Sequence, residues 1–118
     1  MTKDREIATR MWPHHAELLS AEDWTTLSVA AASPTAQAPS VLDPVGQDKD
    51  SMLASLLIIY WTMRVVHLGL QISKDVGPLK GATRITAIFD AIMTRLDDST
   101  PQLVVDKVRE IVEALSDR

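Results

Sequence analysis

The stretch that decides the fold is Met52–Ile72, MLASLLIIYWTMRVVHLGLQI, because its first half is apolar almost all the way around a helix. A helix that is apolar on every side must be buried on several sides. The stretch is also long enough to cross a membrane. However, Arg64 lies inside it, and charged side chains within a bilayer are costly and rare. We therefore predict the buried central helix of a soluble bundle and no membrane span.

The sequence before this helix predicts shorter helices, with residues that mark where they begin and end. A helix begins near Lys3, and Pro13 requires either a kink or a new helix that holds the proline in its first turn. Ser20 and Asp23 have the spacing of a capping box, which predicts a helix from there to about Ala32. Residues 33–47 contain three prolines and a glycine, so we predict a connecting loop.

Two further helices are predicted after the central one, which spans about 48–75. The first covers about 79–97, and the second starts at Ser99-Thr100-Pro101, where a hydroxyl cap precedes a proline at the first helical position. The apolar stripe of this last helix consists of Val104, Val108, Ile111 and Leu115. Because the link between these two helices is short, we expect an antiparallel hairpin. The predicted fold is all-α, a single domain over 1–118, with a four- to five-helix bundle around the central helix.

Composition limits the functional classes. The chain has 118 residues, a net charge of −4 and no cysteine. The acidic balance makes nucleic-acid binding unlikely, since binding phosphates requires a basic face. The absence of cysteine excludes disulfides and thiolate metal sites, and it suits a reducing compartment. The charged amino terminus lacks the apolar core of a secretory signal, so we expect a cytoplasmic protein.

One polar stripe on the central helix is the candidate ligand site. Tyr60, Arg64, His67 and Gln71 recur at helical spacing on an otherwise apolar helix. They could line a pocket in which Arg64 holds an anion and His67 moves a proton. The alternative, which we favour from the sequence, is that the stripe is the solvent side of the helix.

No other constellation carries recognisable chemistry. His14 and Glu17 lack the additional ligands that a metal requires, so no metal site or cofactor is assigned. No phosphate-binding loop or nucleophile motif is present, and no catalytic residue is assigned, so an enzyme is disfavoured. Lys80, Arg84 and Arg95 share one side of a helix, a thin basic strip that most often is a solvated face. A DNA-associated regulator remains a minor alternative.

These observations favour a protein–protein interaction module. Small helical regulators, adaptors and immunity proteins have a similar composition, which is an analogy of class only. A completely buried helix is unusual in a bundle this small, so we expect a homodimer that supplies an additional buried face. The expected interface residues are Trp12, Leu56, Ile59 and Met63. The main alternative is a small-molecule-binding or catalytic bundle that uses Arg64 and His67.

Overall fold

The computed structural model describes residues 3–32, 49–76, 81–96 and 100–116. Helices account for nearly all of these residues, and no strand occurs in these four ranges. In chain order the helices are α1 (Lys3–Met11), α2 (Pro13–Ala16), α3 (Ala21–Ala32), α4 (Lys49–Val76), α5 (Gly81–Arg95), α6 (Gln102–Val105) and α7 (Val108–Ser116). The all-α prediction is confirmed. The predicted loop at 33–47 and the Gly77-Pro78 stop lie outside the described residues.

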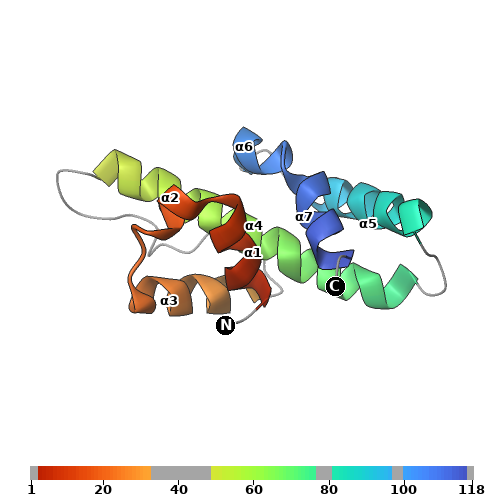
Figure 1. Ribbon diagram of the computed structural model, residues 1–118, viewed down its shortest axis with the longest axis horizontal. Helices are drawn as coiled ribbons and strands as arrows, with labels where there is room; N and C mark the ends of the chain where they lie inside the picture. The colour runs from red at the N-terminus through yellow and green to blue at the C-terminus, as the bar shows by residue number, and fades with distance from the viewer. Residues whose placement is uncertain (1–2, 33–48, 77–80, 97–99, 117–118) are drawn as a thin grey trace.

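Helix α4 is the axis of the molecule. It runs the length of the fold, with α2 and α3 toward its N-terminal end, α5 toward its C-terminal end, and the remaining helices packed against it as well (Figure 1). Between Ser55 and Gly69 every residue of α4 is buried except Leu57 and His67, which are partly exposed. The predicted bundle around a buried central helix is therefore confirmed, and the described ranges contain five longer helices and two four-residue ones.

The cover of α4 comes from the chain itself. All six other helices contact α4, and its apolar side chains belong to one continuous core. The burial of α4 therefore gives no reason to expect a second copy, contrary to the argument made from the sequence. By length and composition one described helix, Ala54–Val76, is apolar enough to cross a membrane, but 78% of its apolar window is buried inside the fold. The core helix of a soluble protein has the same properties, so this is weak evidence for a span.

Local signals place the N-terminal helices as predicted. Pro13 opens α2, the second of the two outcomes expected for it, because its missing N–H costs nothing in a first turn. The capping box is present in full. The Asp23 amide donates to Ser20 Oγ at 3.1 Å, and the Ser20 amide donates to Asp23 Oδ2 at 3.0 Å. These reciprocal bonds satisfy two amides at the start of α3.

The C-terminal segment differs from the single helix that the apolar stripe predicted. It is divided into α6 and α7 because the Lys107 amide donates to the Val104 carbonyl, one residue short of the α-helical partner. The stripe still faces the core, since Val104, Val108 and Ile111 are fully buried. The prediction of a hydroxyl cap is also wrong for Thr100. Pro101 is the N-cap without a side-chain bond, and Thr100 Oγ1 is buried without a partner among the described residues. Ser99 lies outside the described residues.

We expect Ser20→Ala to lower the free energy of unfolding by about 1 kcal/mol, because an orphaned amide at the start of α3 loses its acceptor. Chemical denaturation followed by circular dichroism measures this change. Thr25→Ala in the same helix is the matched control. Its exposed hydroxyl donates only to a carbonyl of its own helix, so this variant should lose no stability. Equal losses in the two variants would contradict a stabilising cap.

Candidate functional site

The polar stripe of α4 passes from the core to the surface beneath α1 and α3. Tyr60 is fully buried and Arg64 is 8% exposed, whereas Gln71 is exposed. The side chain of His67 lies between these extremes, at 32% exposure. The interpretation of the stripe as a solvent face is therefore wrong for Tyr60 and Arg64. Two residues of the stripe, Arg64 and His67, contact the N-terminal helices.

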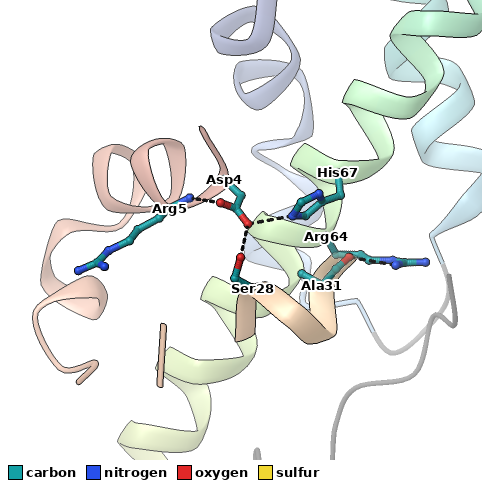
Figure 2. A network of polar contacts seen from close by, with 6 residues as sticks. All are labelled: Asp4, Arg5, Ser28, Ala31, Arg64 and His67. Carbon is teal, nitrogen blue, oxygen red and sulfur yellow. Dashed lines mark hydrogen bonds and ion pairs between the residues drawn. The ribbon is translucent and has the colours of Figure 1, made fainter. Parts of the chain in front are cut away.

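Arg64 serves the end of α3. Its Nη1 donates to the Ala31 carbonyl oxygen at 3.0 Å, in the last turn of that helix (Figure 2). Carbonyls at a helix C-terminus lack partners within the helix and carry partial negative charge, so a guanidinium there is stabilising. This contact accounts for an arginine inside the apolar stretch. It also commits one guanidinium nitrogen to the fold, so the anion-holding role considered from the sequence gains no support from the geometry.

Asp4 is the centre of the network, and the sequence analysis missed it. Its side chain is 2% exposed, and it accepts hydrogen bonds from the Arg5 amide at 2.8 Å and from Ser28 Oγ at 3.0 Å. His67 Nε2 lies 2.8 Å from Asp4 Oδ2. Figure 2 shows these three groups converging on one carboxylate from α1, α3 and α4. An ionised carboxylate is an acceptor only, so it matches three donors.

The contact with Asp4 indicates which ring nitrogen of His67 carries a hydrogen. Because the carboxylate accepts, Nε2 must carry a hydrogen, in either the neutral or the protonated ring. Ser28 donates to Asp4 and not to His67, so the three residues do not form a serine–histidine–aspartate relay, in which the hydroxyl must contact the imidazole. What the arrangement does is join three helices.

A second pair of polar contacts joins the α1–α2 junction to α4. Trp12 Nε1 donates to Thr62 Oγ1 at 2.8 Å, and His15 Nδ1 lies 2.7 Å from Ser55 Oγ. Ser55 and Thr62 are seven residues apart and so share one face of α4. Trp12 is half-buried by this contact. The N-terminal helices are therefore attached to α4 at several points by hydrogen bonds, in addition to apolar packing.

The other residues singled out in the sequence are placed as follows. Leu56, Ile59 and Met63, expected at an interface, are buried in the core of the single chain and offer no surface to a partner in this conformation. In the basic strip, Arg84 donates to the Ser73 carbonyl and hydroxyl and so joins α5 to α4. Lys80 lies outside the described residues. Across the described ranges, no group of three or more histidines and carboxylates is placed to hold a metal ion.

Comparison with known protein families, with curated proteins and with solved structures gives no match to this chain.

We expect Asp4→Asn to lower the free energy of unfolding by about 1–3 kcal/mol, because the side-chain NH2 must face either the Arg5 amide or both Ser28 and His67 and so leaves donors unpaired. His67→Gln should also destabilise, and the loss in the double variant should be smaller than the sum of the two single losses, since both remove one contact. Urea denaturation of the four proteins gives this cycle.

Glu6→Gln is the control, because Glu6 belongs to the same helix but forms an exposed pair with Arg10 at 3.8 Å. Exposed pairs contribute about 0–1 kcal/mol, so little change is expected. Strict additivity of the Asp4 and His67 losses would show that the two residues are not energetically coupled.

Proposed function

We propose that this protein is a helical protein–protein interaction module that pairs with a second copy of itself through the outer face of α3. The outer face is defined here as Thr25, Val29 and Ala32, the exposed residues of the last two-thirds of that helix. The observation that carries the proposal is that this exposed face is uncharged. Val29 is 70% exposed, and α3 has no charged residue after Asp23.

Exposed helix faces are normally charged or strongly polar, which keeps them hydrated. The outer face of α3 has small and β-branched side chains instead, so another helix can approach it closely. Single exposed apolar residues are common and need no explanation. Here the exposed valine lies between a threonine and an alanine on the same face, which makes a continuous uncharged strip.

Symmetry favours a second copy as the occupant. In a twofold contact the same patch meets itself, so a charged patch is placed against its own charge. In a chain with a net charge of −4, an uncharged face avoids this repulsion. If two α3 helices pair in antiparallel orientation, Glu22 and Asp23 of one copy lie at the opposite end of the contact from those of the other. Small residues at the crossing then allow close packing.

The contact is small, which sets the expected strength. A helix of 12 residues is about 18 Å long, so its outer face alone buries less than a standard interface of about 1,600 Å². We therefore expect a weak dimer whose population rises with protein concentration. Such a module would act as a regulator or adaptor through association.

We expect the wild-type chain to show a concentration-dependent monomer–dimer equilibrium in sedimentation equilibrium. Val29→Glu should shift this equilibrium to monomer, because two like charges would face each other across the twofold axis. Leu103→Glu is the matched control, since Leu103 is an exposed apolar residue on α6 at 54% exposure, and the added charge is the same.

Two outcomes would overturn the proposal. One is a monomer at every concentration measured. The other is a dimer that Val29→Glu leaves unchanged, in which case the copies meet at a different face. Circular dichroism spectra of both variants should match the wild type, because both substitutions are on the surface.

A further inference from the structure

The last two-thirds of α3 lack the amphipathic pattern that normally decides which side of a surface helix faces the core. After Asp23 the helix contains no charged residue, and it ends in the run Val29-Ala30-Ala31-Ala32. Four consecutive residues point in four different directions around a helix. Because all four are apolar, burial of apolar surface gives little preference for Ala31, which is buried, over Ala30 or Ala32. Other contacts must therefore help to set the rotation of this part of α3 about its axis.

Charged side chains of the neighbouring helices contact the inner side of α3, about one for each turn. These contacts join the Trp24 ring to the Arg5 guanidinium, Ser28 to the Asp4 carboxylate, and the Ala31 carbonyl to Arg64. The last two are hydrogen bonds of 3.0 Å that reach α3 from α1 and from α4 (Figure 2). A backbone carbonyl points along the helix axis, so its bond constrains rotation little. The bond to Ser28 ends on a side chain and is directional, so it constrains rotation directly.

The outer face of α3 is coupled to these contacts by the geometry of the helix. Each of the three contacted residues directly precedes a residue of the outer face, which consists of Thr25, Val29 and Ala32. Consecutive residues on a helix point about 100° apart. The direction of Ser28 therefore fixes the direction of Val29, the most exposed residue of the outer face. A rotation of α3 by half that angle would turn Val29 away from its present direction.

We infer that Asp4 is a positioning residue for self-association: by holding Ser28, it fixes the rotation of α3 at which the outer face can meet a second copy. This inference rests on the function proposed above, since it concerns the same face. The Asp4 side chain is only 2% exposed, so it acts through α3 and does not contact the partner copy. Because both copies must present the outer face, any loss of orientation weakens the dimer twice over.

The first measurement removes the hydroxyl that links α3 to Asp4. Ser28→Ala should raise the dissociation constant of the dimer about tenfold, the loss expected when about one third of the copies keep the required orientation. Sedimentation equilibrium of the full chain measures this constant. The sign of the change is informative, because a more apolar side chain at the margin of the contact would by itself strengthen association.

Ser55→Ala is the matched control, because it makes the same substitution at another hydroxyl that joins two helices. Ser55 is buried on α4, and its hydroxyl lies 2.7 Å from Nδ1 of His15, in α2. This variant should lose stability in urea denaturation, since a buried hydrogen bond is removed. Its dimer should dissociate at the wild-type concentration, because the contact of α3 with Asp4 is intact.

The second measurement follows the orientation of α3 itself and needs no dimer. The chain has no cysteine, so nitroxide labels can be attached through Val29→Cys on α3 and Ala82→Cys on α5, both at exposed positions. Pulsed electron–electron spectroscopy then gives the distribution of distances between the two labels within one chain. Adding Ser28→Ala should broaden or shift this distribution, and adding Ser55→Ala should leave it unchanged.

The two measurements separate this inference from the proposed function. Weaker association and an altered distance distribution in the Ser28→Ala chain alone support the inference. An unchanged dimer with an unchanged distribution overturns it, because α3 then keeps its rotation without the bond to Asp4. Equal weakening by Ser28→Ala and Ser55→Ala also overturns it, because association then follows overall stability.

A wild-type chain that is monomeric at every concentration overturns the proposed self-association instead. In that case the distance distribution alone decides whether Asp4 fixes the rotation of α3. A dimer that Val29→Glu dissociates and Ser28→Ala leaves intact, with an unchanged distance distribution, keeps the proposed function and removes the role of Asp4.

Discussion

The structure depends on covering one helix that is apolar on nearly every side. The 15 residues of α4 from Ser55 to Gly69 leave only Leu57 and His67 partly exposed, and a chain of 118 residues must supply the cover. It does so by packing the six other described helices against α4 (Figure 1). Burial of apolar surface is the main favourable term in folding, so this arrangement fixes the fold class.

The N-terminal helices (α1–α3) and the C-terminal helices (α5–α7) are attached to α4 in different ways. In the C-terminal helices, the inward-facing side chains are mainly aliphatic. The buried ones include Ile88, Ile92, Val104, Val108 and Ile111. For the N-terminal helices, four polar residues of α4 (Ser55, Thr62, Arg64 and His67) each meet a residue of α1–α3 or the short links between them. Hydrogen bonds are directional, so these contacts fix the position of each helix along α4 in a way that apolar packing alone does not.

Local rules account for what could be predicted from the sequence. Helix α3 starts where Ser20 and Asp23 cap it, and α2 starts at Pro13, because each signal acts within four residues of itself. The central helix was also predictable, since a long apolar run has few other stable conformations. The division between α6 and α7 was not, because both sides of it keep helical backbone angles and the apolar stripe continues through it.

The site was only half predictable, for a physical reason. The stripe on α4 was visible because polar residues stand out in an apolar helix. Asp4 was not, because in the run Lys3-Asp4-Arg5-Glu6 it is one charge among four, and such a run normally faces solvent. Its burial is decided by Ser28 and His67, which are 24 and 63 residues away in the chain. No local pattern carries that information.

The buried carboxylate bears on how the molecule behaves as well as on how it was predicted. Burying a carboxylate costs free energy that its hydrogen bonds must offset, so stability alone does not explain why the buried Asp4 meets the partly exposed His67. The contact between Asp4 and His67 constrains where α1 lies on α4. The Asp4 carboxylate has its hydrogen-bond partners only when α1, α3 and α4 are all in place. It would lose them if α1 shifted by one residue along α4. The same contact therefore makes the position of α1 on α4 specific.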